Sequence, residues 1–244
     1  MRSYDLIASL YADDMGVSMR WPDADYYLQC ARSAPGPVLE LGCGSGRILR
    51  QLRQRGIDVI GADLSLPMLR QAQRDPSLAE QPMLQMDLRQ LGLRGQHFAL
   101  ALLPYSLATY LLDSTCWQGL ADGLRQALRP GAGVVLDAFV PRSDLPVGRW
   151  LRDYARTTAT GWLVRHKRIS HLIEGQNQIE RRYRWSGSGH TLQTCETIRP
   201  LSPIELRALA ERFLGPVCAI CWDYDPARGE HGASHCTLTC RLRD

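Results

Sequence analysis

The chain has 244 residues, of which 45% are hydrophobic and 22% charged, with a formal net charge of +4. This composition can form one substantial core, and single α/β domains reach this length. The small net charge requires neither a nucleic acid nor an anionic membrane as partner. No apolar run approaches the ~20 residues of a membrane span, and the beginning of the chain lacks the apolar stretch of a signal peptide. We therefore expect a cytoplasmic protein that is not bound to a membrane.

An apolar run from about Pro37 to Leu41 predicts a first strand, which leads into a loop rich in glycine. The loop reads Glu40-Leu41-Gly42-Cys43-Gly44-Ser45-Gly46. Alternate glycines let the backbone turn sharply and let a ligand approach main-chain atoms that a Cβ would block. Glu40 places a carboxylate at the mouth of this turn. The segment indicates a loop that holds a nucleotide-like cofactor.

The spacing of the loop, G-x-G-x-G, differs from the G-x-G-x-x-G of the dinucleotide fingerprint, because Arg47 follows the third glycine. Acids also end the next two predicted strands. Asp63 can accept hydrogen bonds from both hydroxyls of a ribose, and Asp87 beside Leu88 suits the amine and the face of an adenine. Acids at three successive strand ends disfavour a ligand with phosphates. The implied ligand is a nucleoside with a cationic tail that resembles an amino acid.

Strand and helix patterns alternate through the first 140 residues. We expect further strands at Ile57–Asp63, Met83–Met86, Phe98–Leu103 and Gly133–Asp137, helices after the glycine loop and after Ser65, and a helix over Ser114–Leu128. Nearly continuous apolar strands that are joined by helices are typical of a parallel sheet covered on both faces. The pattern predicts an α/β fold with a doubly wound, mostly parallel sheet of seven strands. Ligands bind at the carboxyl ends of such strands.

The character of the sequence changes after Pro141. Short turns separate three predicted antiparallel strands at Trp162–Ile169, Gln178–Trp185 and Thr191–Ile198. A helix with Ser202 as its N-cap follows, and strands at Val217–Trp222 and Cys236–Cys240 complete the larger sheet. We expect one domain made of residues 1–149 and 200–244, with residues 150–199 as an antiparallel β insertion that covers the substrate cleft.

The insertion holds most of the basic excess. Residues 151–199 contain nine Arg or Lys and four Asp or Glu. Arg181, Tyr183 and Trp185 share one strand face by alternation. They either offer guanidinium and aromatic groups to an anionic or planar substrate, or form a solvated face with aromatics packed on the core. Whether Arg181 or Arg182 points into the cleft distinguishes the two interpretations.

Two pairs of cysteines superficially resemble halves of a zinc site. Cys218 and Cys221 lie on one predicted strand and point to opposite faces, while Cys236 and Cys240 on another share a face but are ~13 Å apart. Neither pair can chelate a metal without breaking its strand. We therefore expect no metal, and expect these cysteines to be buried small hydrophobic residues with reduced thiols.

These motifs together resemble the class I S-adenosylmethionine-dependent methyltransferases, over nearly the whole chain. The resemblance is carried by the glycine loop with Glu40, by Asp63-Leu64-Ser65 with Met68 behind it, and by Asp87. The insertion is similar to the substrate-covering layer of the sugar N,N-dimethyltransferases and of the enzymes that resemble glycine N-methyltransferase. The resemblance implies S-adenosyl-L-methionine as cofactor and S-adenosyl-L-homocysteine as its product.

The resemblance also implies roles for individual residues. Glu40 and the glycine loop, with Cys43 as a small residue in it, hold the aminopropyl-sulfonium part. Asp63 holds the ribose, and Asp87 with Leu64 and Leu88 holds the adenine. Tyr11 resembles the tyrosine that covers the methionine end, and Arg47 either meets the cofactor carboxylate or merely begins a helix. The expected cofactor-binding residues are Tyr11, Glu40, Gly42, Cys43, Gly44, Gly46, Arg47, Asp63, Leu64, Met68, Asp87, Leu88 and Leu103.

Methyl transfer from a sulfonium needs little beyond placement of the acceptor. Tyr105 falls where members of the family surround the donor methyl, and we expect it to position the reactants. A base is needed only for an acceptor that is protonated at neutral pH, and Asp137 and Tyr224 are candidates for it.

We expect transfer to nitrogen or oxygen of a small metabolite, anionic or aromatic, by a monomer or homodimer. Three alternatives stay open. A tRNA or protein methyltransferase would use the basic insertion as its contact, an NAD-type oxidoreductase would need the loop to tolerate a diphosphate, and a non-catalytic sensor would keep only the cofactor site. A nucleic-acid substrate is disfavoured by the small net charge.

Overall fold

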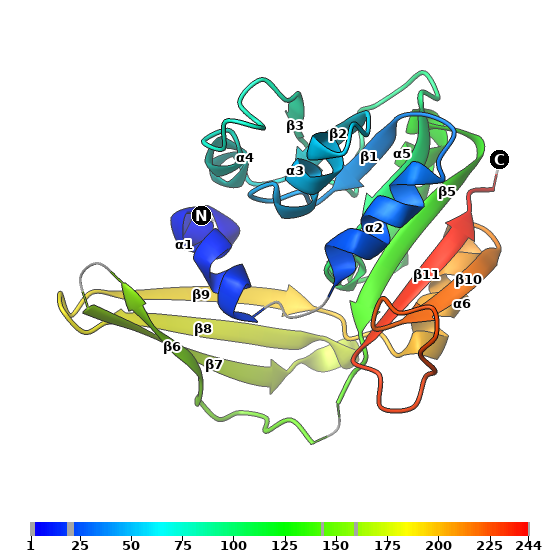
Figure 1. Cartoon of the computed structure of the whole chain (residues 1–244). Coiled ribbons are helices and arrows are strands. Elements are labelled where there is room, and N and C mark those ends of the chain that lie inside the picture. Colours follow the sequence, from blue (N-terminus) through cyan, green and yellow to red (C-terminus); the bar gives the residue numbers. More distant parts are fainter. Residues whose placement is uncertain (1–2, 19–21, 143, 159–160, 244) are drawn as a thin grey trace. The chain divides into compact units, whose positions relative to one another are not determined.

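The computed structural model describes residues 3–18, 22–142, 144–158 and 161–243. The chain divides into two compact units, one formed by Met1–Val140 with Leu201–Asp244 and the other by Pro141–Pro200. The first unit contains the larger sheet and all helices longer than one turn, and the second is a smaller sheet (Figure 1).

A sheet of seven strands forms the centre of the first unit. Its strands are β1 (Val38–Leu41), β2 (Val59–Asp63), β3 (Met83–Gln85), β4 (Phe98–Leu103), β5 (Leu128–Phe139), β10 (Val217–Trp222) and β11 (His235–Arg241), in the order β10-β11-β5-β4-β1-β2-β3. The five strands from β1 to β5 pair in parallel, and β11 lies antiparallel between β5 and β10. The predicted α/β fold with a mostly parallel sheet is therefore confirmed.

Helices cover both faces of this sheet. Helices α2 (Asp23–Arg32) and α3 (Arg47–Gln54) supply buried side chains to one core. Helices α5 (Ser114–Ala127) and α6 (Pro203–Phe213) supply them to the other, where Trp117 stacks on Phe213. All residues of β1 and β4 are buried, which explains why both strands are apolar except for Glu40 in β1. Helices α1 (Ser3–Ser18) and α4 (Leu66–Ala72) and the 3-10 turn η1 (Leu107–Tyr110) complete the unit.

The ends of two elements are fixed by local chemistry. Ser202 caps α6 as predicted: its hydroxyl accepts from the Glu205 amide while the Glu205 carboxylate accepts from the Ser202 amide. The fifth strand was predicted from Gly133, but β5 already begins at Leu128. A register shift between Phe98 and Leu100 of β4 accommodates the additional residues, among them Pro130 and Gly131.

The second unit is a four-stranded antiparallel sheet, whereas the sequence predicted three strands. Its strands are β6 (Leu151–Thr158), β7 (Gly161–His171), β8 (Asn177–Trp185) and β9 (Thr191–Ile198), joined in that order, with a 3-10 turn, η2 (Ile173–Gly175), between β7 and β8. The missed strand, β6, is an edge strand without apolar alternation. It is held by pairing with β7 and by an ion pair of 2.8 Å between Asp153 and Arg165.

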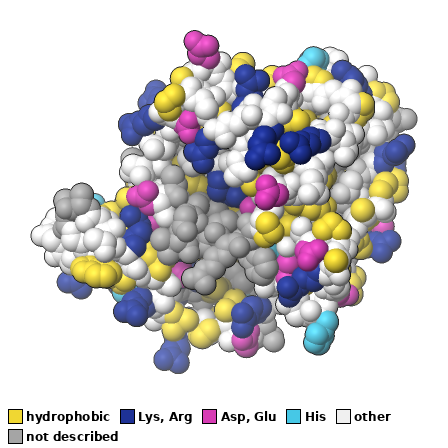
Figure 2. All heavy atoms as spheres, viewed as in Figure 1, with side chains coloured by type: hydrophobic (Ala, Val, Ile, Leu, Met, Phe, Trp, Pro, Cys, Tyr) yellow, Lys and Arg dark blue, Asp and Glu magenta, His cyan; other side chains and the backbone are white. Residues whose placement is uncertain are grey.

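The expected burial of the cysteines is confirmed for Cys221, Cys236 and Cys240 and is wrong for Cys218, which is exposed because it lies near the start of the edge strand, β10. All eight cysteines are free. Among the residues that the structure describes, no three metal-ligating side chains cluster. No described helix has both the length and the apolarity that a membrane span requires. On the face drawn in Figure 2, basic and acidic side chains are interspersed.

Candidate functional site

The glycine loop joins β1 to α3 through residues in the left-handed region. Gly44 has φ +55° and Gly46 has φ +81°. A Cβ on Gly46 would lie 2.5 Å from Leu78 Cδ1, so this position requires glycine for packing as well as for conformation. A Cβ on Gly44 would meet the end of Met68 at 3.2 Å. The loop is thus held tightly against α4 and the segment that follows it.

Asp63 at the end of β2 ties this loop to the next one. Its Oδ2 accepts a hydrogen bond from the Gly44 amide and its Oδ1 one from the Ser65 amide, both at 2.8 Å. Burial raises the pKa of Asp63, and the backbone donors oppose that rise. The Ser65 hydroxyl in turn caps α4 and donates to Asp5 of α1 at 2.6 Å. The Asp63 carboxylate therefore links the first two βα loops, and the Ser65 hydroxyl links the second loop to α1.

Glu40 is a buried acid with an unsatisfied oxygen. Its side chain is 2% exposed, and its Oε2 has no hydrogen-bond partner. Burial raises the pKa of Glu40 from its ordinary 4.5 to about 8, although the nearby Arg47 opposes the shift. Glu40 lines a narrow cavity in the first unit. The other lining residues are Tyr11, Gly42, Cys43, Gly44, Ser45, Arg47, Ile48, Pro104 and Tyr105.

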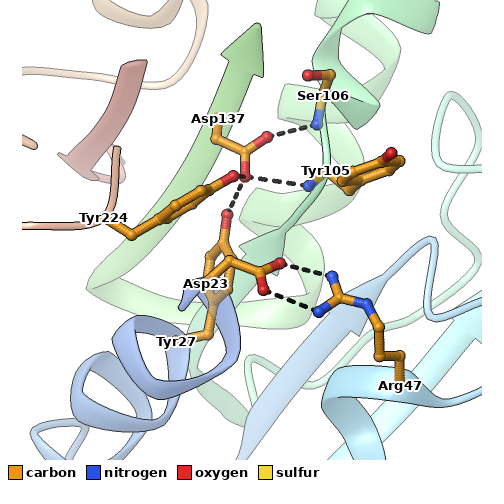
Figure 3. Close-up of polar contacts among 7 residues, drawn as sticks. All are labelled: Asp23, Tyr27, Arg47, Tyr105, Ser106, Asp137 and Tyr224. Atoms are coloured by element: carbon orange, nitrogen blue, oxygen red, sulfur yellow. Dashed lines mark hydrogen bonds and ion pairs between the residues drawn. The ribbon is translucent and has the colours of Figure 1, made fainter. Parts of the chain in front are cut away.

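Arg47, the first residue of α3, is held by a bidentate pair with Asp23, the first residue of α2 (Figure 3). The two N–O distances are 2.8 and 2.5 Å, and the Asp23 side chain is only 1% exposed. Arg47 therefore has a structural partner within the chain and also lines the cavity. Arg47 begins a helix, as one of the two alternatives from the sequence has it, and its contact with the cofactor carboxylate stays a prediction.

Tyrosines border the same cavity. Tyr11 of α1 lines it and contacts the ring of Tyr4 edge-on, with centroids 5.7 Å apart. The Tyr4 and Tyr110 hydroxyls are hydrogen-bonded at 2.7 Å. Burial raises the pKa of Tyr11 well above 10.0, so its hydroxyl stays neutral. Tyr11 thus lines the same cavity as the glycine loop, and its contact with the methionine end of a cofactor stays a prediction.

The residues expected around an adenine lie at the ends of β2 and β3. Asp87 is partly exposed and pairs with Arg89 at 2.6 Å. Leu64 and Leu88 are half-buried near these strand ends, and Gln85 donates from its amide to the Leu64 carbonyl. Met68 and Leu103 are fully buried, Met68 against the glycine loop and Leu103 at the end of β4. Their assignment to the cofactor stays a prediction.

A second buried carboxylate, Asp137 of β5, is fully hydrogen-bonded. Its Oδ2 accepts from the Tyr27 hydroxyl at 2.5 Å, the Tyr224 hydroxyl at 2.7 Å and the Tyr105 amide at 3.0 Å, and its Oδ1 accepts from the Ser106 amide (Figure 3). Burial raises the pKa of Asp137, while these four donors lower it.

This arrangement disfavours Asp137 and Tyr224 as catalytic bases, because four donors fill the carboxylate and the Tyr224 hydroxyl is itself one of them. Neither residue lines the cavity around Glu40, whereas Tyr105 does. Tyr27 and Ser106 were not identified from the sequence. No local pattern marks Tyr27, because its partner Asp137 lies 110 positions away.

A larger cavity, of about 390 Å³, lies near the amino ends of the parallel strands. Ala99 at the beginning of β4, Gly133 in β5 and Pro35 before β1 line it. It is remote from the carboxyl ends of the parallel strands, where Glu40, Asp63 and Asp137 gather. The acids predicted from the sequence therefore gather near the smaller cavity and not near the larger one.

The fold and the site define a class of protein. The glycine loop after β1, the acids at or near the ends of β1 and β2, and the parallel sheet completed by an antiparallel β11 agree with the resemblance to the class I methyltransferases. Residues 38–131 match the family described as "Methyltransferase domain". Residues 38–131 of the chain are thus identified as a methyltransferase domain.

Curated relatives match part of the chain. A malonyl-[acyl-carrier protein] O-methyltransferase of Salmonella typhimurium is 34% identical over 174 residues, which cover 69% of this chain and 64% of the relative. Another, from Pseudescherichia vulneris, is 38% identical over 109 residues, 45% of this chain and 41% of the relative. The matched part of this chain therefore spans less than two thirds of the length of either relative.

Solved structures match nearly the whole chain in fold. The CcbJ methyltransferase from Streptomyces caelestis has a TM-score of 0.84 at 21% identity, covering 100% of this chain and 99% of that chain. The sugar N-methyltransferase KedS8 from Streptoalloteichus sp. has a TM-score of 0.70 at 18% identity, covering 96% and 92%. At these identities the likeness establishes the fold, which includes an element like the second unit.

Proposed function

We propose that the chain transfers the methyl group of S-adenosyl-L-methionine to a nitrogen or oxygen of a small metabolite. The observation that carries this proposal is the buried, unpartnered Oε2 of Glu40 in the cavity beside the glycine loop. A buried acceptor without a partner is costly in a folded protein. A ligand that carries an ammonium group offsets this cost, and a diphosphate does not, because it would add negative charge beside a carboxylate.

Residues of this chain fit the other parts of the cofactor. The Asp63 carboxylate is held in place by two amides and lies at the strand end where a ribose is recognised. Tyr11 borders the cavity with a neutral ring, and Asp87 follows β3. When bound, the cofactor supplies an activated methyl group. The chain supplies a binding site that orients it and excludes water.

The cavity offers little for proton removal. The ionisable side chains that line it are Tyr11, Glu40, Cys43, Arg47 and Tyr105. Burial raises the pKa of the Cys43 thiol and of the Tyr11 hydroxyl, so neither ionises readily. An acceptor that reacts as a neutral amine or as a carboxylate needs no base in the transfer step. Placement in line with the methyl group is then the main contribution of the protein.

A carboxylate acceptor is a specific second candidate. The curated relatives from Salmonella typhimurium and Pseudescherichia vulneris are described as O-methyltransferases of malonyl-[acyl-carrier protein]. The second unit contributes Arg165, Arg181 and Lys167 on one sheet face, although Arg165 pairs with Asp153 and Arg181 with Glu196.

Labelled methyl transfer tests the proposal. The purified protein is incubated with methyl-labelled S-adenosyl-L-methionine and a fractionated cell extract, and NAD serves as the competing ligand in a parallel binding experiment. Label in the low-mass fraction supports the metabolite, and label on a small carrier protein supports the second candidate. Label in RNA contradicts both, and a preference for NAD contradicts the methyltransferase function itself.

A further inference from the structure

The turn after β4 is backbone-strained. Tyr105 and Ser106 are not glycines, yet their φ angles are +59° and +58°, in the left-handed region. Two successive residues in this region are costly for side chains with a Cβ. The turn therefore needs an external support to hold the Tyr105 ring at the cavity that Glu40 lines.

Asp137 gives this support from the neighbouring strand. Two successive amides, those of Tyr105 and Ser106, point at its carboxylate, in the way that backbone nests bind anions. The Ser106 hydroxyl accepts from the Phe139 amide at 2.8 Å, and the Phe139 ring contacts the Tyr105 ring edge-on at 5.4 Å. The backbone and the ring of the turn are both fixed on β5.

Two phenols then fix the carboxylate itself. Tyr27 comes from α2, and Tyr224 comes from the connection after β10. Asp223 and Tyr224 are also left-handed, with φ +48° and +62°, and the Asp223 carboxylate accepts from the Ser234 and His235 amides at 2.8 Å. Strained turns that are far apart in the sequence thus meet at one buried carboxylate (Figure 3).

We infer that Tyr27, Asp137 and Tyr224 are positioning residues that act through Tyr105 on the bound cofactor. None of them lines the cavity around Glu40, so their effect on a ligand passes through the turn that Asp137 holds. The inference rests on the proposed function, because it requires that the cofactor occupies this cavity. It assigns Asp137 and Tyr224 a role different from the proton transfer expected for them from the sequence.

The neighbouring Tyr26 provides a matched control. It lies beside Tyr27 on α2, and its ring contacts Tyr224 at 5.9 Å, as does the ring of Tyr27 at 6.1 Å. Its hydroxyl is close to Thr239 and Cys30 and not to Asp137. Tyr26→Phe and Tyr27→Phe therefore each remove one hydroxyl from the same helix. Only the hydroxyl of Tyr27 is hydrogen-bonded to the Asp137 carboxylate.

The test measures binding of S-adenosyl-L-homocysteine by calorimetry, so no acceptor has to be known. We expect Tyr27→Phe and Tyr224→Phe to weaken binding about 5- to 10-fold, the effect of one hydrogen bond to a charged group. Tyr26→Phe should leave it within about twofold. In a Tyr105→Ala background, Tyr224→Phe should weaken binding no further, because residues that act through one another are not additive.

Hydrogen exchange gives a second measurement that requires no ligand. The amides of Tyr105 and Ser106 should exchange faster in Tyr224→Phe than in Tyr26→Phe. Equal exchange, unchanged affinity in both phenol variants, or fully additive losses with Tyr105→Ala would overturn the inference. If the wild-type protein does not bind S-adenosyl-L-homocysteine, the proposed function fails first, and the inference falls with it.

Discussion

Glu40 at the end of β1 and Asp137 in β5 are both buried carboxylates near the same edge of the sheet, but they differ in their hydrogen bonds. Glu40 has an oxygen without a partner, and Asp137 accepts four hydrogen bonds. Burial raises the pKa of both. In the function proposed above, the oxygen of Glu40 that has no partner contacts the cofactor, whereas the four donors to Asp137 fix the segments around it.

Residue type alone does not show what a carboxylate at such a site does. From the sequence, either Glu40 or Asp137 could contact a ligand or act as a base, since both lie near the ends of apolar runs. Their partners distinguish them, and these partners come from α2, the turn after β4 and the connection after β10. Substitutions at these two carboxylates and at neighbouring positions test whether their different hydrogen bonds have different consequences, from the largest expected effect to the smallest.

Asp137→Ala should have the largest effect. It leaves two buried phenols and two backbone amides without an acceptor, so we expect a loss of about 3–5 kcal/mol in the free energy of unfolding. Urea unfolding of the variant and of the wild type measures the loss. Asp122→Ala, at an exposed position of α5, is the control and should change stability by less than about 0.5 kcal/mol. A small loss in Asp137→Ala would mean that the four hydrogen bonds do not stabilise the fold.

Glu40→Gln should change the pH dependence of stability and weaken cofactor binding. The pKa of Glu40 is about 8 in the folded protein, above its ordinary 4.5, so the folded state keeps a proton that the unfolded chain loses. The free energy of unfolding therefore falls as pH rises from about 4.5 to 8, by at most about 1.4 kcal/mol per pH unit.

In Glu40→Gln, the contribution of Glu40 to the fall in the free energy of unfolding should be absent. Unfolding of the wild type and the variant at pH 5.5 and 7.5 measures the difference. We also expect the variant to bind S-adenosyl-L-homocysteine about 10- to 100-fold more weakly, because a carboxamide cannot form an ion pair with the ammonium group. The same slope in both proteins would argue against a buried proton on Glu40. Unchanged affinity would argue against its contact with the cofactor.

Gly46→Ala and Gly56→Ala separate packing from backbone conformation. Their φ angles are similar, +81° and +78°, but a Cβ on Gly46 would lie 2.5 Å from Leu78, while nothing lies within 4 Å of one on Gly56. Both variants incur the left-handed strain, and only Gly46→Ala adds overpacking. We expect Gly46→Ala to be the less stable by about 1–3 kcal/mol in thermal or urea unfolding. Equal losses would mean that Leu78 moves aside freely.

Asp87→Asn should have the smallest effect. The side chain of Asp87 is 24% exposed and that of its partner Arg89 45%, so we expect stability to change by less than about 1 kcal/mol. If Asp87 accepts from the adenine amine, binding of S-adenosyl-L-homocysteine should weaken by about two- to fivefold. Competition with S-inosyl-L-homocysteine, which lacks that amine, is the check. Equal discrimination between the two ligands in wild type and variant would remove Asp87 from the adenine site.

Local patterns predicted much of the first unit. Apolar runs predicted β1, β2 and β4 because parallel strands buried on both faces admit few polar residues. The capping residues of α6 and the left-handed glycines of the first loop are determined within a few residues of sequence, so they too were predictable. Strand β6 was missed because an edge strand that depends on its neighbour for pairing needs no apolar alternation of its own.

By itself the sequence determined the α/β class, the glycine loop and the acids at or just beyond the ends of β1, β2 and β3, since each depends on a short stretch of chain. Only the tertiary structure decided which carboxylate is satisfied. Asp137 receives its donors from residues 31, 32, 87 and 110 positions away. Hydrogen bonds over such separations depend on how the strands and helices pack, and no local pattern encodes them. For that reason Tyr27 could be recognised as part of the site only once α2 lay against β5.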